Sequence, residues 1–288
     1  SYKYLGKNSF FSVLVGFFSF LFNKKSFNEV LYYSRKREKV INERLSKGYD
    51  LVFCDMIRCA QFLTDYNGVC HVDLDDLLSR RYLGYSNSLY SVDQFKSMLG
   101  IFKDYFPRVF YVLIFPFAKW FLLKEHKILE SKEVLVANRF SSCSLVSPIE
   151  SRFLSSRSGQ YVWSLPMAMD APFIKKSTDE FDRNRAVFVG SMDYEPNLNS
   201  ILYFEREFVP RLTEDDYFRY FSLSVIGNRS GKFDSGENLS MIDFLGYVDN
   251  LFDEVVKYSY YFAPISAGTG IKTKILEAFA LGIPVITT

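Results

Sequence analysis

Short apolar runs alternate with longer mixed or charged stretches along this chain, a pattern typical of strands that alternate with helices. A charge-rich helix is predicted over Phe27–Ser46, and another helix is predicted to start at Ser147–Glu150. The strands predicted in the first half are Leu51–Cys54, Val69–Leu74, Val134–Ala137 with Leu145–Val146, and Tyr161–Pro166. Alternating strands and helices indicate parallel sheets and an α/β protein.

The most informative stretch is Tyr261–Val285, near the end of the chain. An apolar run reaches the turn Gly268–Gly270, and a helical pattern follows with Lys272 and Lys274 in its first turn and Glu277 one turn later. A strand, a tight turn and a helix start in this order make a phosphate site, because the helix end offers backbone N–H groups and a positive dipole. The glycines allow close backbone approach, and the lysines add charge. The ligand predicted is a nucleotide diphosphate.

Each charged residue of this helix has a competing interpretation as a solvated surface group. A lysine in a first helical turn is electrostatically misplaced unless an anion offsets the helix dipole, so we favour a phosphate role for Lys272 and Lys274, with Lys274 preferred. Glu277 lies on the same helical face as Lys274, where a carboxylate can accept hydrogen bonds from a ribose. We favour this role over that of a solvated helix acid.

At this point the residues resemble the family-4-like glycosyltransferases of the two-Rossmann-domain (GT-B) architecture. In that family a segment like Ala267–Val285 binds a nucleotide-sugar, its acid holding the ribose and its turn and basic residues holding the diphosphate. Ala186–Ser200 is similar to the opening strand and loop of the donor domain. Leu223–Asn228 and Phe244–Asp249 resemble the two strands that flank the base pocket. The resemblance is firm from about Pro166 to the end of the chain.

The resemblance implies an α/β fold of two Rossmann-like domains with a cleft between them. Pro166–Asp170 takes the place of the family's interdomain turn, with the proline and the acid retained. We therefore expect an acceptor-side domain over residues 1–165 and a nucleotide-sugar donor domain over residues 166–288. Neither a glycine-rich acceptor loop at the start nor a long helix after the last strand is visible in the sequence, so we expect both domains to be incomplete.

The candidate site collects residues from several predicted strand ends, where ligands bind in open α/β sheets. Gly190 and Ser191 follow an apolar strand and can offer backbone N–H groups to the diphosphate, while Asn197 lies at the next helix start. Tyr247 either stacks on a base or packs in the core. The predicted donor-binding residues are Gly190, Ser191, Asn197, Gly227, Asn228, Tyr247, Val248, Gly268, Thr269, Gly270, Ile271 and Glu277, and the predicted catalytic residues are Lys274, Lys272 and Asp76.

Asp76 enters through the resemblance alone. The family carries a histidine-aspartate pair at this strand end, which reaches the donor sugar; here Asp75 takes the histidine place and Asp76 matches the aspartate. Thr269 is a second departure, because the family's usual signature has an acid eight residues before Glu277. A branch with the Gly-Thr-Gly-basic-x-Lys form lacks that acid too.

No metal site is expected. Asp73–Asp75 has the Asp-x-Asp form of metal-dependent single-domain glycosyltransferases, but the flanking motifs argue against that class. His71 and His126 are isolated, which supports neither a zinc site nor a Ser-His-acid triad. No cofactor is expected either, since the nucleotide-sugar is a substrate.

The charge of the chain is unevenly distributed. Residues 1–50 carry ten Lys or Arg against four Asp or Glu, a net charge of +6 within an overall +2, which indicates an anionic partner. Phe10–Phe22 is too short and interrupted to span a membrane and is predicted to be either interfacial or core. Val109–Leu123 has the same two interpretations, with a buried core helix favoured. Four cysteines without paired spacing indicate reduced thiols in a cytoplasmic protein.

The resemblance implies a retaining, metal-independent glycosyltransferase that moves a sugar from a nucleotide-diphosphate sugar to a glycan or lipid-linked acceptor in polysaccharide biosynthesis. An anionic membrane surface at the cytoplasmic face is a further candidate partner, and no nucleic acid is expected. Two alternatives stay open. Gly268–Gly270 could open the fingerprint of a dinucleotide-dependent oxidoreductase, although the third glycine would fall at Thr273. The departures at Thr269 and Asp75 also fit a catalytically inactive nucleotide-sugar-binding protein.

Overall fold

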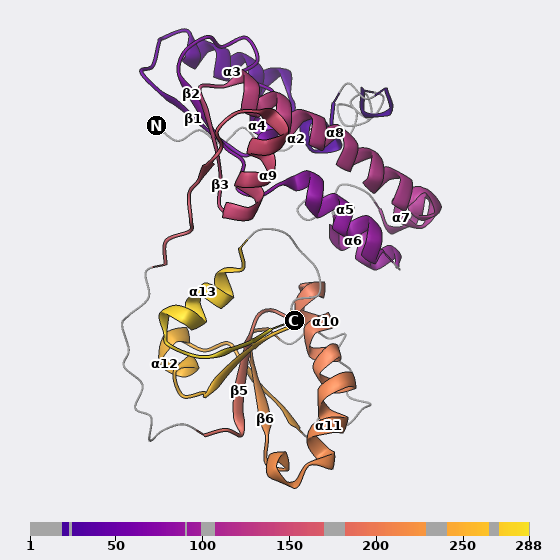
Figure 1. Ribbon diagram of the computed structural model, residues 1–288. Helices are drawn as coiled ribbons and strands as arrows, with labels where there is room; N and C mark the ends of the chain where they lie inside the picture. The colour runs from indigo at the N-terminus through magenta and orange to yellow at the C-terminus, as the bar shows by residue number, and fades with distance from the viewer. Residues whose placement is uncertain are drawn as a thin grey trace. The chain divides into compact units, whose positions relative to one another are not determined.

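The computed structural model describes residues 19–22, 25–89, 91–98, 107–169, 182–228, 241–264 and 271–287. The chain divides into two compact units (Figure 1). Unit 1 is taken here as the described residues up to Pro166, and unit 2 as those from Met167 onward apart from Ile271, which is grouped with the first unit. Each unit is described by itself.

Unit 1 is built on a four-stranded parallel sheet in the order β1-β2-β3-β4. In its register Cys54 pairs with Val72, and Val72 pairs with Cys143. These three side chains are buried in one row and belong to the core of the unit. The strands are β1 Val52–Asp55, β2 Cys70–Asp73, β3 Ser142–Leu145 and β4 Trp163–Ser164.

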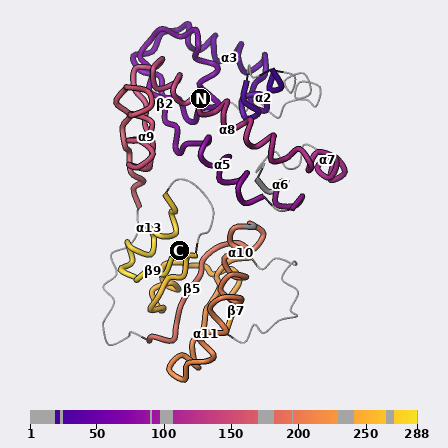
Figure 2. The backbone as a smooth tube through the Cα atoms, turned by 45° about the vertical axis from the view of Figure 1, so that its right-hand side comes forward, coloured from indigo at the N-terminus to yellow at the C-terminus, as the bar shows by residue number. Residues whose placement is uncertain are grey.

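A long helix, α8, organises the helical layer of unit 1. It runs beside α5, as Figures 1 and 2 both show, and its buried residues Leu122, Leu129 and Val136 recur every seven positions along one face. The helices of unit 1 are α2 Phe27–Tyr32, α3 Arg35–Leu45, α4 Ile57–Ala60, α5 Leu78–Ser88, α6 Val92–Met98, α7 Arg108–Ile114, the 3₁₀ turn η2 Phe115–Phe117, α8 Ala118–Arg139 and α9 Pro148–Ser158.

Two buried glutamates of α8 hold the starts of neighbouring helices. Glu125 accepts hydrogen bonds from the backbone N–H groups of Phe27, at 2.7 Å, and Asn28, at 3.0 Å, where α2 begins. Glu133 accepts from the N–H of Ser79, at 2.9 Å, in the first turn of α5. Burial raises the pKa of both carboxyl groups to about 7. The two residues satisfy helix-end donors that would otherwise be buried without partners.

Two sequence predictions for unit 1 are wrong in detail. The helix predicted over Phe27–Ser46 is two helices, because Tyr33 and Ser34 are extended and the Ser34 side chain caps α3 by accepting from the N–H of Arg37. Val134–Ala137 is not a strand but part of the last turns of α8. A four-residue apolar run has too little periodicity to separate a strand from a buried helical turn.

Unit 2 is built on a five-stranded parallel sheet in the order β7-β6-β5-β8-β9. From β5 the sheet extends through β6 and β7 in one direction and through β8 and β9 in the other. The strand order therefore reverses between β5 and β8, which is the switch point of a doubly wound fold. The strands are β5 Arg185–Val189, β6 Ser222–Ile226, β7 Ile242–Gly246, β8 Tyr260–Ala263 and β9 Val285–Thr287.

Helices cover both faces of this sheet (Figure 1). Successive residues of β5 serve the two sides: Phe188 packs with Ile201 and Phe204 beneath α10, and Val187 packs with Ala278 beneath α13. The helices are α10 Glu195–Tyr203, the π-helical η4 Phe204–Phe208, α11 Val209–Glu214, the 3₁₀ turn η5 Asp216–Phe218, α12 Leu251–Val255 and α13 Thr273–Ala280. The predicted α/β class with parallel sheets is confirmed.

Candidate nucleotide-binding site

Several of the predicted site residues of unit 2 lie at the switch point of the sheet. After β5 the chain turns through Gly190 and Ser191 into α10, and α13 begins shortly after β8, at Thr273. The hydroxyl of Ser200 on α10 donates to the carbonyl of Pro264, at 2.8 Å, and so ties this helix to the end of β8. Ligands of open α/β sheets bind at this position.

Two glycines let the strand ends come close together. Gly227 has φ +138°, and a Cβ there would lie 2.4 Å from the carbonyl oxygen of Gly190. A Cβ on Gly190 would lie 2.5 Å from Nδ2 of Asn197. The N–H of Gly190 donates to the carbonyl of Ile226, at 2.9 Å, and the N–H of Gly227 donates to that of Gly246, at 2.8 Å. Close approach of two backbone segments thus requires the glycine at position 227, whereas the space beside Gly190 is filled by the Asn197 side chain.

Asn197 bridges the loop after β5 and the helix after β8. Its Nδ2 donates to the carbonyl of Ser191, at 3.0 Å, and its Oδ1 accepts from Nζ of Lys274, at 2.8 Å. The same Nζ lies 4.5 Å from the ring centroid of Phe188, a fully buried residue of β5. An amide oxygen and an aromatic face are both attractive to an ammonium group. Together they hold the Lys274 charge at the switch point.

The environment of Lys274 also lowers its pKa, to about 8. Burial is the largest cause, and repulsion from Lys272 is the second, while Glu277 acts in the opposite direction. An ammonium group that has lost part of its hydration and faces another cation gains strongly from an anion beside it. The pair of lysines therefore favours a polyanionic ligand.

The start of α13 adds to this positive potential. Lys272 occupies the N-cap position, Lys274 lies in the first turn, and that turn contains no acidic residue. The helix N-terminus carries partial positive charge and N–H groups without intrahelical acceptors. The predicted placement of both lysines at this helix start is confirmed, whereas their contact with a phosphate stays a prediction.

Glu277 lies one turn further along α13 and is half-buried. Glu277 interacts electrostatically with Tyr261 on β8, whose side chain is fully buried. Burial raises the pKa of the Tyr261 hydroxyl, and the negative charge of Glu277 raises it further. Among the residues that the structure describes, this hydroxyl has no hydrogen-bond partner.

Phe188 and Tyr261 are the residues near the site that the sequence did not predict. Both lie within apolar strand runs, and such runs indicate a core rather than a site. The pairing of β5 with β8 sets the two strands side by side, with the Phe188 ring beside Nζ of Lys274 and with Tyr261 in the core cluster beneath α13.

The remaining predicted donor-binding residues are more scattered. Tyr247 follows β7 and is 80% exposed, which rules out the core position considered for it. Val248 packs partly against the core on the α13 face, and the carbonyl of Asn228 accepts from the N–H of Met192, at 2.9 Å. Ile271 is half-buried just before α13. Gly268, Thr269 and Gly270 lie outside the described residues.

Asp76 lies in unit 1 and forms a buried ion pair. Its Oδ2 accepts from both Nε and Nη2 of Arg81, at 2.9 Å and 2.5 Å. The neighbouring Asp75 has a positive φ of 63°, and its pKa is raised by burial and then by the charge of Asp76. The pairing with Arg81 gives Asp76 a structural role. Its predicted contact with a donor sugar stays a prediction.

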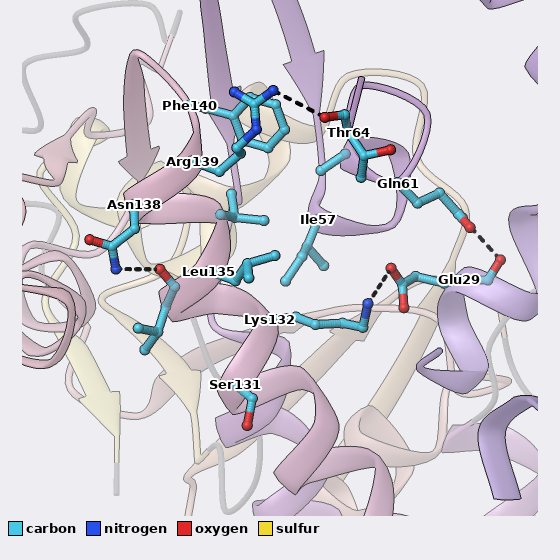
Figure 3. A pocket seen from close by; sticks show the side chains of 13 residues that line it. Glu29, Ile57, Gln61, Thr64, Ser131, Lys132, Leu135, Asn138, Arg139 and Phe140 are labelled. Atoms are coloured by element: carbon cyan, nitrogen blue, oxygen red, sulfur yellow. Dashed lines mark hydrogen bonds and ion pairs between the residues drawn. The ribbon is translucent and has the colours of Figure 1, made fainter. Parts of the chain in front are cut away.

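A cavity of about 590 Å³ lies in unit 1, lined mainly by α4 and α8 (Figure 3). Its wall is largely apolar, and an ion pair between Lys132 and Glu29, at 2.9 Å, lies on it. Nη2 of Arg139 donates to the carbonyl of Thr64 at 3.0 Å. None of the predicted site residues lines this cavity.

The predicted chemistry also concerns metal ligands, membrane-spanning helices and cysteines in the described ranges. Within them, no group of three His, Cys, Asp or Glu side chains is arranged to hold a metal ion. No described helix combines the length and the apolar character that crossing a membrane requires. Cys54, Cys59, Cys70 and Cys143 are all free thiols. The expected absence of a metal cofactor stays a prediction.

Comparisons with known proteins agree with this geometry. Residues 183–288 match a family model described as glycosyl transferases group 1. A comparison with curated proteins found no match. Among solved structures, that of TarM has a TM-score of 0.54 at 9% identity, over 86% of this chain and 43% of that chain. That of Anabaena HepE in complex with UDP has a TM-score of 0.51 at 14% identity, over 86% of this chain and 62% of that chain.

A second TarM structure, from S. aureus, contains fondaparinux, α-GlcNAc-glycerol and UDP, and its TM-score is 0.51 at 10% identity. The chain spans less than two thirds of the length of each of these proteins. At such identities the likeness shows the fold alone, and it confirms the predicted GT-B type. The chain thus has a GT-B-type fold, and residues 183–288, mainly in its second unit, match the model of the glycosyl transferases group 1 family.

Proposed function

We propose that the protein transfers a sugar from a nucleotide-diphosphate sugar to a glycan or lipid-linked acceptor, with retention of configuration and without a metal ion. The observation that carries the proposal is Lys274, held by Asn197 and Phe188 at the switch point of the sheet in unit 2. This arrangement lies within the residues that match the glycosyltransferase group 1 family. HepE was solved with UDP, so a uridine nucleotide is the first donor to test.

In this proposal the positive groups act on the leaving diphosphate. Negative charge develops on it as the bond from the sugar to the phosphate oxygen breaks, and Lys274, Lys272 and the N-terminus of α13 stabilise that charge. Because Asn197 and Phe188 already hold the Lys274 ammonium, little reorganisation is needed when the charge forms. Glu277 accepts hydrogen bonds from the ribose. Retention of configuration is inferred from the resemblance to the family-4-like enzymes.

The acceptor and the location are proposed on separate grounds. A TarM structure holds an oligosaccharide and a glycosylated glycerol, which supports a glycan acceptor for proteins of this fold. The net charge of +6 in residues 1–50 supports peripheral association with the anionic inner face of a membrane, where lipid-linked glycans are assembled. The biosynthesis of a polysaccharide fits both.

The family match favours this function over the dinucleotide-dependent oxidoreductase. A catalytically inactive nucleotide-sugar-binding protein stays a second candidate, because Asp75 and Thr269 replace residues that contact the donor in the resembled family. The two candidates differ only in turnover.

Calorimetric titration of the chain with UDP, GDP, uridine and NADH tests the proposal. We expect at least one nucleoside diphosphate to bind ten-fold or more tightly than its nucleoside, and NADH to bind no better than the nucleoside. Binding of NADH without binding of a diphosphate would contradict the proposal. A protein that binds nucleotide-sugars but neither hydrolyses nor transfers them, with its complete chain and an acceptor present, would be the inactive form.

A further inference from the structure

An apolar face lies on the outside of unit 1, along α7, η2 and the start of α8. Its side chains recur at helical intervals, and their exposed fractions run from 51% for Trp120 to 69% for Leu113. The opposite side of the same segment is buried, with Tyr111, Ala118 and Phe121 in the core of the unit. The residues of this face, called the α7–α8 face below, are Val109, Val112, Leu113, Phe117 and Trp120.

The predicted burial of the segment Val109–Leu123 is wrong for the α7–α8 face. The segment is apolar on both sides, and only one side can face the core. A contiguous exposed apolar surface on one face of a helix marks an interaction site more often than a random surface does.

Basic residues surround the α7–α8 face. Lys119 and Lys127 are exposed, and Arg108 is exposed at the start of α7, where it makes a 3.4 Å ion pair with Asp93 of α6. Lys124 lies with its Nζ 5.4 Å from the ring centroid of Trp120. Within residues 107–127 the only acidic residue is a glutamate that is buried against α2. The rim is therefore strongly positive even after the charge of Asp93 is counted.

A second segment of the chain, which contains Phe20 and Phe22, packs beside the start of α8. Phe20 is buried, with its ring centroid 4.9 Å from that of Phe121 on α8, and the Nζ of Lys124 lies 5.7 Å from the Phe20 ring. Two residues later Phe22 is largely exposed. Aromatic rings from two distant parts of the sequence, those of Phe20 and Trp120, thus lie near the same lysine.

We propose that the α7–α8 face docks the chain on an anionic lipid bilayer. This inference rests on the membrane association proposed above and identifies the surface that carries it. The apolar side chains enter the boundary between headgroups and acyl chains, Trp120 lies at that boundary, and the lysines reach the lipid phosphates with their amino groups.

The positive charge around the α7–α8 face argues against a second copy of the chain as the partner that covers it. A two-fold dimer brings the same surface of both copies together, so the basic residues around one α7–α8 face would oppose their own copies. Anionic lipid instead offers the complementary charge.

Tryptophan fluorescence gives a direct readout, because the chain contains only Trp120 and Trp163. The variant Trp163→Phe leaves Trp120 as the sole reporter. With vesicles of equal phosphatidylglycerol and phosphatidylcholine at low salt, we expect a blue shift of its emission and protection from acrylamide quenching. With pure phosphatidylcholine vesicles we expect a much smaller change.

Cosedimentation with the same vesicles separates the apolar and the electrostatic contributions. Leu113→Ser with Phe117→Ser should weaken binding at least ten-fold, whereas Leu135→Ser with Ile149→Ser, which alters similarly exposed residues of α8 and α9, should leave it unchanged. Lys119→Glu should weaken binding about five-fold or more, and the matched reversal Lys257→Glu, at an exposed lysine just after α12, should have little effect. UDP affinity is measured in parallel, so that failure of docking and failure of the donor site are distinguished.

Equal losses of vesicle binding in the variants of the α7–α8 face and in their controls would overturn the proposal. So would a blue shift of Trp120 that grows with protein concentration in the absence of lipid, since a second copy would then cover the face. If the double serine variant unfolds, as judged by circular dichroism, the comparison of Lys119→Glu with Lys257→Glu and the Trp120 spectrum decide the question.

Discussion

Nζ of Lys274 lies 2.8 Å from Oδ1 of Asn197, a residue 77 positions earlier in the chain. Because Nδ2 of the same amide donates to the carbonyl of Ser191, the amide can present only its oxygen to the lysine. The contact therefore orients a positive charge by means of a residue that is itself fixed to the loop after β5.

The lowered pKa of Lys274, about 8, predicts a pH-dependent affinity for nucleoside diphosphates. A diphosphate favours the charged lysine, so above pH 8 binding must be coupled to proton uptake, and affinity should fall by up to about ten-fold per pH unit. Lys274→Arg keeps its charge throughout and should give a flatter profile. Titrations with UDP from pH 6.5 to 9.5 measure this, and a flat profile for the unmodified chain would contradict the assignment.

Removal of the amino group should discriminate between ligands. Lys274→Ala is expected to weaken UDP binding by about 1.5–3 kcal/mol, the range for a hydrogen bond to a charged group, and to leave uridine binding nearly unchanged. Lys257→Ala, just after α12, removes a lysine that pairs with Glu254 at the surface; it is the matched control and should alter neither affinity. Equal losses for UDP and uridine would mean that Lys274 contacts no phosphate.

Glu277→Ala should weaken binding of both UDP and uridine, because the proposed contact is with the ribose that they share. The expected loss is about 1.5–3 kcal/mol, and the melting temperature should stay close to that of the unmodified chain. Glu214→Ala, which removes an exposed acid at the end of α11, serves as the control. Unchanged affinity for both ligands would make Glu277 an ordinary helix residue.

Two glycine substitutions should change stability in opposite directions. Gly227→Ala places a Cβ 2.4 Å from the backbone oxygen of Gly190 at φ +138°, so we expect a loss of about 1–3 kcal/mol in the free energy of unfolding. Gly84→Ala lies within α5, where a Cβ meets no atom within 4 Å, and should increase stability by up to about 1 kcal/mol. Urea denaturation of both variants measures the difference. If Gly227→Ala leaves the free energy of unfolding unchanged, the two strand ends can separate without loss of stability.

Much of the donor unit could be predicted because its signals are local. Ala186–Val189 of β5 and Tyr260–Ala263 of β8 are continuous apolar runs, as is typical of buried parallel strands. Lys274 and Glu277 lie three positions apart in one short helix, so their common face follows from helix geometry alone. The asparagine at the start of α10 could be predicted as a site residue, but its lysine partner could not.

The amino-acid sequence by itself determined the alternation of strands and helices, the helix start beside Lys272 and Lys274 and the family resemblance, because each depends on residues close together in the chain. Only the tertiary structure decided that β5 lies beside β8, and hence that Phe188 and Asn197 meet Lys274. It likewise decided which side of α7 faces water, since a segment that is apolar on both sides has no pattern from which to predict this. The physical reason is the same in both cases: contacts between distant segments depend on how the sheets and helices pack, and short-range periodicity carries no information about that packing.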